Sequence, residues 1–163
     1  MAEVLTGPFA IAALVVAIAG VAKLRAPAPA AEALVTLGMP PARWLVRLAA
    51  LVELGLAGWC LASPGRWPAV ALALAYAGFS VVAALLARRR ASCGCFGEDA
   101  EVSVIHVGLS ALLAVICAAA AVWTPPAVLA AGSVPLALGV AGAAYAVVLA
   151  YTELPAAWSA WWA

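Results

Sequence analysis

Long apolar segments separated by short polar breaks run through the chain and predict its secondary structure. A helix needs about 20 apolar residues to cross a membrane, at a rise of about 1.5 Å per residue. Five segments reach that length: residues 8–24, 42–62, 67–87, 104–123 and 127–151. Pro135 falls inside the last segment, so we expect its first turns to be kinked or interfacial. The pattern predicts an all-α integral membrane helical bundle forming a single domain over residues 1–163, with four core helices and a fifth. A four-span alternative, in which the last segment is peripheral, stays open.

Two stretches interrupt the apolar pattern and are expected to be surface loops. In residues 25–41, the run Ala26-Pro27-Ala28-Pro29 breaks the first helix, because proline lacks an N–H donor. Residues 31–37 can form a short surface helix, which Gly38 and the prolines after it end. The second stretch, residues 88–103, separates the third and fourth spans.

Composition supports a membrane protein and excludes one class of partner. The chain is 69% apolar and 9% charged, whereas soluble domains are about half apolar and about a quarter charged. The eight Lys and Arg residues lie at helix ends and in loops, and the net charge is only +1. We therefore expect the lipid bilayer as the surroundings and no nucleic-acid binding.

Tryptophans mark where the spans should meet the membrane surfaces. Trp59, Trp67 and Trp123 fall at the ends of three spans that meet at one interface, and Trp44 marks the other. An indole suits this depth because it has an apolar body and one N–H donor.

The distribution of basic residues predicts an orientation. Seven of the eight belong to the two loops already described or to the adjoining helix ends, and only Arg66 falls on the opposite side. Cytoplasmic loops carry the excess of Lys and Arg. We therefore expect the N-terminus outside the cell and the loop of residues 88–103 at the cytoplasmic surface.

Several glycines on the spans are expected to allow close helix packing. Small residues let helix backbones approach in lipid, and they more often serve tight packing within a bundle than a dedicated dimerisation motif. The candidates are Gly55, Gly58, Gly108, Gly139 and Gly142.

The strongest chemical signal is Cys93-Gly94-Cys95-Phe96-Gly97, in the loop after the basic run of residues 88–90. Two thiols one residue apart can form a small, strained disulfide, and strained disulfides are the labile, exchanging kind. The basic run favours the thiolate, and the acidic residues that follow the motif oppose it. A redox-active pair is the preferred interpretation. A metal-binding pair with His106 as a third ligand, or an inert loop, are the alternatives.

Two ionisable residues inside or near the spans are further candidates for the site. Glu53 lies near the middle of the second span, where a charge is costly, so it is either a proton-transfer group or a structural acid paired with a base such as Lys23. His106 lies in the first turn of the fourth span and can accept a cysteine proton, contact a quinone oxygen, or have no special role. Lys23 and Arg47 are expected to be anchors that extend to the membrane surface.

Cys60 and Cys117 lie late in the second and fourth spans, at similar depth. They can form an outer thiol pair or be small buried apolar residues, and the second interpretation is the usual one for a free cysteine.

Several short motifs resemble those of the MauE/DoxX-like family of small membrane proteins, whose MauE members are associated with methylamine utilisation. The resemblance covers roughly residues 8–120, and its cysteine motif is the most specific part. The matching motifs are Gly20-Val21-Ala22-Lys23-Leu24-Arg25, Leu37-Gly38-Met39-Pro40, Glu53-Leu54-Gly55 and Ser92-Cys93-Gly94-Cys95-Phe96-Gly97.

The resemblance implies a role in the redox or disulfide maturation of partner proteins, in the bacterial inner membrane and sometimes beside a thioredoxin-like protein. It implies thiol–disulfide exchange at Cys93 and Cys95. Two features depart from the family pattern. Members often carry an Arg-Asn pair where this chain has Ile105-His106-Val107-Gly108. MauE is also linked to maturation outside the cytoplasm, whereas the charge pattern puts this motif inside.

Three functions follow as hypotheses. The first is a membrane thiol–disulfide oxidoreductase that uses Cys93 and Cys95, with Phe96 as a contact for a membrane quinone and a protein thiol or thioredoxin-like protein as partner. The second is a non-enzymatic accessory subunit of a larger membrane complex. The third and weakest is a metal-handling protein.

Overall fold

The computed structural model describes residues 2–92, 102–125 and 134–162. Within these ranges the chain forms six helices and five of them, all but α2, are long and apolar enough to cross a membrane. The expected all-α membrane bundle is confirmed. The helices are α1 (Ala2–Arg25), α2 (Ala28–Thr36), α3 (Arg43–Ala62), α4 (Arg66–Arg88), α5 (Val104–Trp123) and α6 (Val134–Trp162).

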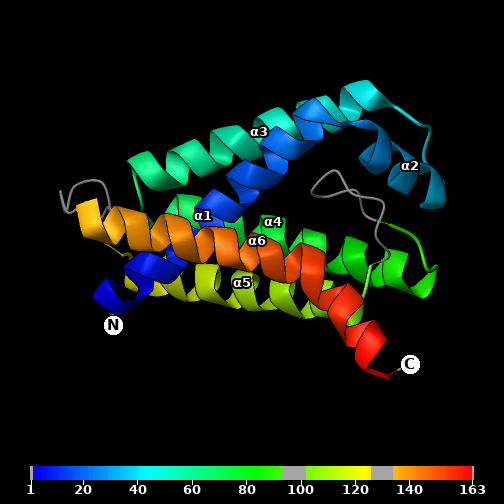
Figure 1. Ribbon diagram of the computed structural model, residues 1–163. Helices are drawn as coiled ribbons and strands as arrows, with labels where there is room; N and C mark the ends of the chain where they lie inside the picture. The colour runs from blue at the N-terminus through cyan, green and yellow to red at the C-terminus, as the bar shows by residue number, and fades with distance from the viewer. Residues whose placement is uncertain (1, 93–101, 126–133, 163) are drawn as a thin grey trace.

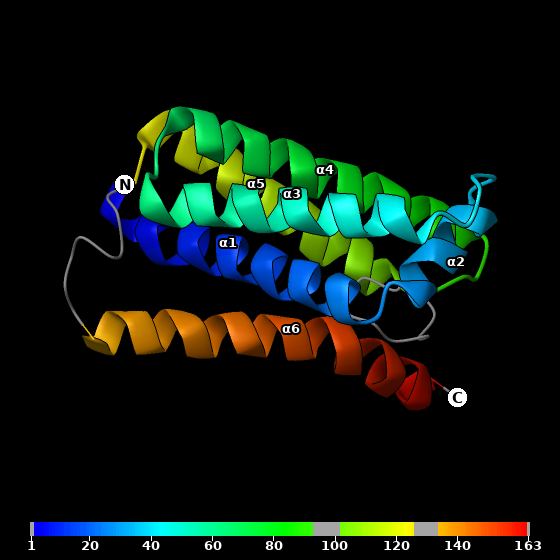
Figure 2. The same cartoon turned by 90° about the horizontal axis from the view of Figure 1, so that it is seen from above.

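The five long helices lie side by side and alternate in direction (Figure 1). Helix α1 packs against α3, α5 and α6, and α4 packs closely along α5. Figure 2 shows α6 along one edge of the bundle, beside α1, with the two chain ends at opposite ends of the molecule. The short helix α2 lies at the end of the bundle where α1 ends and α3 begins.

Apolar side chains from every long helix meet in the centre of the bundle. Phe9 and Val16 of α1 pack there with Leu72 of α4 and Leu113 of α5, and all four are at least 95% buried. The opposite faces of the same helices expose leucine, valine and tryptophan. Apolar residues all round a helix are what a lipid-embedded bundle needs, because water wets neither its core nor its outer faces.

The prolines of α6 and α1 lie at different distances from their helix starts. Pro135 is the second residue of α6, so it occupies the first turn and not the interior of a span. Its missing N–H is one of those left unpaired at any helix start. Helix α1 begins at Ala2 and contains Pro8 about two turns from its start.

The glycine prediction is wrong for all five positions. A Cβ added at Gly55, Gly58, Gly108, Gly139 or Gly142 would meet nothing within 4 Å, because these glycines lie on the exposed faces of their helices. The close approach occurs at Gly20 instead. A Cβ there would lie 3.0 Å from the carbonyl oxygen of Ala50 and 3.1 Å from Cγ of Leu54. Composition could not separate the two kinds of position, because outer and inner faces are both rich in small residues.

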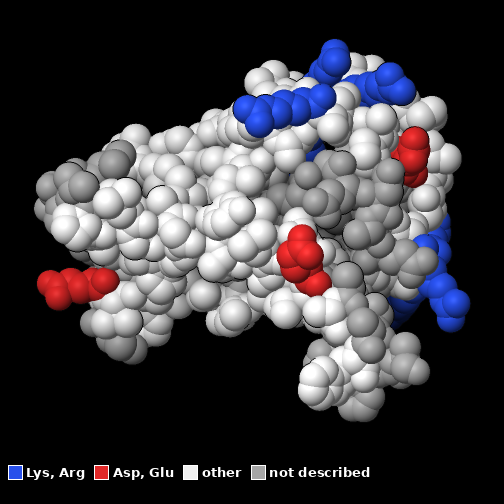
Figure 3. All heavy atoms as spheres, viewed as in Figure 1, with Lys and Arg blue, Asp and Glu red and all other residues white. Residues whose placement is uncertain are grey.

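Basic residues gather at one end of the bundle, around α2 (Figure 3). This end collects the last turn of α1, the start of α3 and the last turn of α4, which carry Lys23, Arg25, Arg43 and Arg88. We call it the basic end. Arg66 begins α4 at the opposite end.

Candidate functional site at the basic end of the bundle

The loop that carries the cysteine motif starts and finishes at the basic end. Cys93, Cys95 and Phe96 lie outside the described residues, but the chain on either side is described. The N–H of Val102 donates to the carbonyl of Ala91 at 3.0 Å. This hydrogen bond joins the segment that leaves α4 to the segment that enters α5. Cys93 directly follows Ser92, the last described residue of this segment. The motif is therefore attached to a closed stem at this end.

Hydrophobic packing holds the stem in place. Val102 is buried against Ala33 of α2 and Leu86 of α4, and Ala91 and Val107 pack around them. The guanidinium Nη1 of Arg89 donates to the carbonyl of Thr36, so α4 is also tied to the end of α2. Helix α2 thus forms a support beneath the base of the loop.

Helices α2 and α4 end in the same hydrogen-bonded turn. After α4, the N–H of Arg90 donates to Ala87 and that of Ala91 donates to Leu86, and Arg90 has a φ of 50°. After α2, Gly38 takes the equivalent place with a φ of 86°. This is the Schellman ending, in which a left-handed residue closes the helix. It explains Gly38 in the Leu37-Gly38-Met39-Pro40 motif, and at Arg90 it turns the chain into the stem of the cysteine loop.

His106 caps the helix that begins after the loop. Its Nδ1 accepts from the N–H of Ser103 at 3.1 Å, and the Ser103 Oγ lies 3.2 Å from the same atom. Ser103 Oγ in turn accepts from the N–H of Ile105 at 3.2 Å. An Nδ1 that accepts a backbone N–H leaves the ring proton on Nε2. His106 is buried, and in this arrangement it offers Nε2–H as a donor.

Lys23 and Glu53 form a buried ion pair between α1 and α3. Lys23 Nζ lies 2.5 Å from Glu53 Oε1, and both side chains are 10% exposed. The prediction that Lys23 extends to the membrane surface is therefore wrong, and the paired alternative for Glu53 is the one observed. A lone charge inside an apolar bundle is costly, and the buried carboxylate of Glu53 neutralises the ammonium of Lys23.

Further contacts of α1 with α3 and α4 position the Lys23–Glu53 pair. Gly20 lies one turn before Lys23, and Ala50 lies one turn before Glu53, so the close approach of α1 and α3 brings the two charges together. Lys23 Nζ also lies 5.3 Å from the centre of the Phe79 ring, within the range of a cation–π contact. The other carboxylate oxygen of Glu53, Oε2, has no hydrogen-bond partner within residues 2–92, 102–125 and 134–162.

A second polar group joins α5 to α6. The hydroxyls of Ser110 and Tyr151 are 3.0 Å apart, and both residues are buried. The rings of Tyr151 and His106 have centres 5.8 Å apart. A small cavity of about 40 Å³ lies between this group and Lys23, lined mainly by apolar atoms of α1 and α4. Polar residues therefore continue from the cap of α5 towards the Lys23–Glu53 pair.

Sequence reasoning missed Ser103, Ser110 and Tyr151. The spacing Ser103-x-x-His106 is a signal that was available, because a serine followed three residues later by an accepting side chain is a capping pattern. Ser110 and Tyr151 stand alone in apolar helices, and no sequence pattern connects residues 41 positions apart.

The cysteines inside the spans are free and buried. Cys60 and Cys117 belong to the central core, and Cys60 Sγ lies 3.5 Å from the carbonyl of Pro68. Among the described residues, no group of three or more His, Cys, Asp and Glu side chains is placed to hold a metal ion.

Comparison with known proteins identifies one family. No curated protein and no solved structure matches the chain significantly. The family model described as methylamine utilisation protein MauE matches residues 1–124, which include α1 to α5, the cysteine loop, Lys23, Glu53 and His106. Tyr151 and α6 lie beyond the match. Because the match covers most of the 163 residues, the chain belongs to the MauE family.

Proposed function

We propose that this MauE-family membrane protein is a thiol–disulfide redox factor whose reactive groups are Cys93 and Cys95. Its partner is a protein thiol, of the thioredoxin-like class or a protein undergoing maturation. The observation that carries the proposal is the closed stem, because the Ala91–Val102 hydrogen bond and the packing of Val102 hold the ends of the motif's loop against α2 and α4. A rigid base beneath a short reactive loop is what repeated exchange with a partner requires.

The reaction has two halves. In the first, a thiolate of the partner attacks one sulfur of the Cys93–Cys95 disulfide and forms a mixed disulfide, and the second partner thiolate then resolves it. The partner loses two electrons and two protons and becomes a disulfide, while Cys93 and Cys95 become thiols. In the second half, the same two electrons and two protons pass to a membrane quinone, which becomes a quinol and restores the disulfide. Phe96 is the proposed contact for the quinone ring.

Protons move with the electrons, and we assign their handling to His106. Glu53 is held in its ion pair with Lys23. His106 lies four residues beyond the buried Val102 of the stem, and its Nε2 remains outside the capping bonds. The Ser110–Tyr151 pair lies beside His106, on the side towards the cavity and Lys23.

The proposed setting is the bacterial inner membrane, with the basic end in the cytoplasm. The support is the gathering of Lys and Arg around α2 and the ends of α1, α3 and α4. The cysteine loop, which leaves α4 at that end, then faces the cytoplasm.

Cysteine substitutions test the proposal directly. Purified protein is oxidised with a water-soluble quinone and mixed with reduced thioredoxin as the probe thiol. The wild type should convert one thioredoxin dithiol to disulfide per chain. The variants Cys93→Ser and Cys95→Ser should show only the background rate, because either one removes the exchanging disulfide.

The matched controls are Cys60→Ala and Cys117→Ala, whose thiols are buried and free in the bundle core. Both should keep the wild-type rate. Wild-type activity in both Cys93→Ser and Cys95→Ser would exclude the thiol mechanism.

A second candidate is a non-enzymatic accessory subunit of a membrane complex. The exposed glycines of α3, Gly55 and Gly58, favour it, because small residues on an outer face let another helix approach closely. This candidate predicts co-purification with a fixed partner, and cellular function that survives the loss of both loop cysteines.

A further inference from the structure

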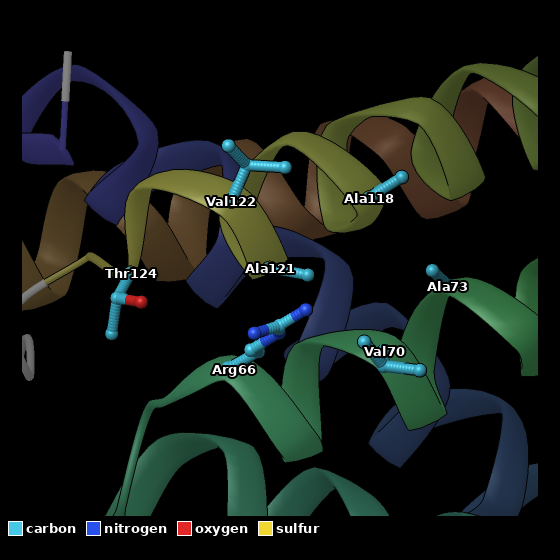
Figure 4. Close-up of a pocket in the computed structure, with 7 residues that line it drawn as sticks. All are labelled: Arg66, Val70, Ala73, Ala118, Ala121, Val122 and Thr124. Atoms are coloured by element: carbon cyan, nitrogen blue, oxygen red, sulfur yellow. The ribbon is translucent and has the colours of Figure 1, made fainter.

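A groove of about 660 Å³ lies between α4 and α5, at the end of the bundle opposite the cysteine loop. Arg66, the first residue of α4, and Thr124, which follows the last residue of α5, are its polar members (Figure 4). Its walls are apolar and come from both helices: Val70, Ala73, Ala118 and Val122. The groove takes no part in the thiol chemistry proposed above.

Small side chains open the groove between two helices that otherwise pack closely. Ala73 of α4 and Ala118 and Ala121 of α5 have only a Cβ to fill the space between the backbones. Neither Ala118 nor Val122 is covered by another part of the described chain, since both are exposed. The groove is thus open to whatever surrounds the bundle along its length.

Arg66 brings an unbalanced positive charge to this apolar groove. In Figure 4 its side chain reaches from the first turn of α4 towards Ala121 on α5. Among the described residues Lys23 and Glu53 form the only ion pair, and the side chain of Arg66 makes no hydrogen bond or ion pair there. None of the described residues that line the groove carries a carboxylate. An exposed guanidinium has five N–H donors in a planar fork that matches a phosphate group.

The depth of Arg66 in the membrane is indicated by its neighbours. Trp67 and Trp123 are 72% and 45% exposed, and they stand beside the two polar members of the groove. Tryptophan side chains gather at the level of the lipid head groups. Arg66 therefore lies where phosphates of the bilayer lie, and the apolar walls extend from there towards the membrane centre.

We propose that this groove binds one anionic phospholipid. The phosphate contacts the guanidinium of Arg66 and the hydroxyl of Thr124, and an acyl chain lies along Val70, Ala73 and Ala118. An anionic head group fits better than a zwitterionic one, because the groove offers a cation and no carboxylate to pair with a lipid amine or choline.

Lipid retention measured by native mass spectrometry tests the proposal. The full-length protein is purified in detergent with added phosphatidylglycerol or phosphatidylcholine, and bound lipids are counted as the detergent-to-lipid ratio rises. The wild type should hold one phosphatidylglycerol at least about tenfold more tightly than phosphatidylcholine, as expected for a charge-assisted contact. Arg66→Gln should lose this preference, and Arg66→Lys should keep part of it.

Two further variants separate the head-group contact from the groove. Arg43→Gln removes an exposed charge at the other end of the bundle and should bind phosphatidylglycerol like the wild type. Ala118→Phe keeps Arg66 but fills the groove, and it should weaken retention. The proposal fails if Arg66→Gln or Ala118→Phe retains phosphatidylglycerol like the wild type, if phosphatidylcholine binds equally well, or if inorganic phosphate at millimolar concentration displaces the lipid.

Discussion

At the scale of residues, Lys23 and Glu53 show what a charged pair in a membrane bundle requires. Each side chain alone would place a charge in an apolar interior, which costs several kcal/mol. Together they neutralise one another at 2.5 Å, and Phe79 adds a cation–π contact to the ammonium. Both residues belong to motifs that carry the family resemblance, so the pair accounts for two of those motifs with one contact.

A double-mutant cycle measures this coupling. Lys23→Met and Glu53→Gln should each lower the free energy of unfolding by about 3 to 5 kcal/mol, because each disrupts a buried ion pair and leaves one partner uncompensated. The double variant should lose less than the sum of the two. The measurement is denaturant-induced unfolding in detergent micelles. The control is Arg47→Met, since Arg47 is an exposed charge on α3, the helix that carries Glu53. Additive losses would show that the two side chains do not interact.

The same pair shows how far the sequence could be read at this scale. A lone Glu53 in the second span is visible as an anomaly, and Lys23 is one of few bases that could reach it. The choice between a proton-transfer acid and a paired acid depends on the rotation of α1 against α3, which no periodicity specifies. The contact between Ser110 and Tyr151 could not be predicted either, because it depends on the rotation of α5 against α6.

At the scale of elements, one glycine fixes the packing of α1 on α3. A Cβ at Gly20 would lie 3.0 Å from a backbone oxygen of α3, which cannot move like a side chain. The exposed glycines of α3 and α6 carry no such constraint. The difference lies in the direction each glycine faces, and an apolar helix in lipid lacks the polar face that would reveal this direction.

Alanine substitutions distinguish these positions. Gly20→Ala should force α1 and α3 apart, lower the free energy of unfolding by about 1 to 3 kcal/mol and weaken the Lys23–Glu53 contact. Gly55→Ala, on the exposed face of α3, should stay within about 0.5 kcal/mol of the wild type. Thermal unfolding in the same detergent compares them. Equal effects of the two substitutions would contradict the helix packing described here.

At the scale of the whole molecule, the basic residues are concentrated at one end of the bundle. The element order and the alternating direction of the helices bring the ends of α1 and α4 and the start of α3 to one end. Five long apolar segments made the all-α membrane bundle predictable. Because successive spans run in opposite directions, the sequence alone also places seven of the eight basic residues at the same end. The extent of α6 was less predictable, because Thr152, Glu153 and Pro155 interrupt the apolar pattern, whereas the helix continues to Trp162.

Thiol labelling in intact cells tests the sidedness. A membrane-impermeant maleimide should label Cys93 and Cys95 only after the cells are permeabilised, because positive residues flank a cytoplasmic loop. The matched reporter is Arg66→Cys in a Cys93→Ser/Cys95→Ser background, which should be labelled from outside. Cys60 and Cys117 are buried and should stay unlabelled. Labelling of Cys93 and Cys95 in intact cells would reverse the orientation.

The central claim is that Cys93 and Cys95 act as a reversible redox pair. It is tested most directly by the redox state of all four cysteines in native membranes, measured by differential alkylation and mass spectrometry after quinone oxidation and again after reduced thioredoxin is added. We predict that Cys93 and Cys95 change together from disulfide to dithiol, while Cys60 and Cys117 remain free thiols throughout. Cys93 and Cys95 that remain thiols after quinone oxidation would contradict the claim.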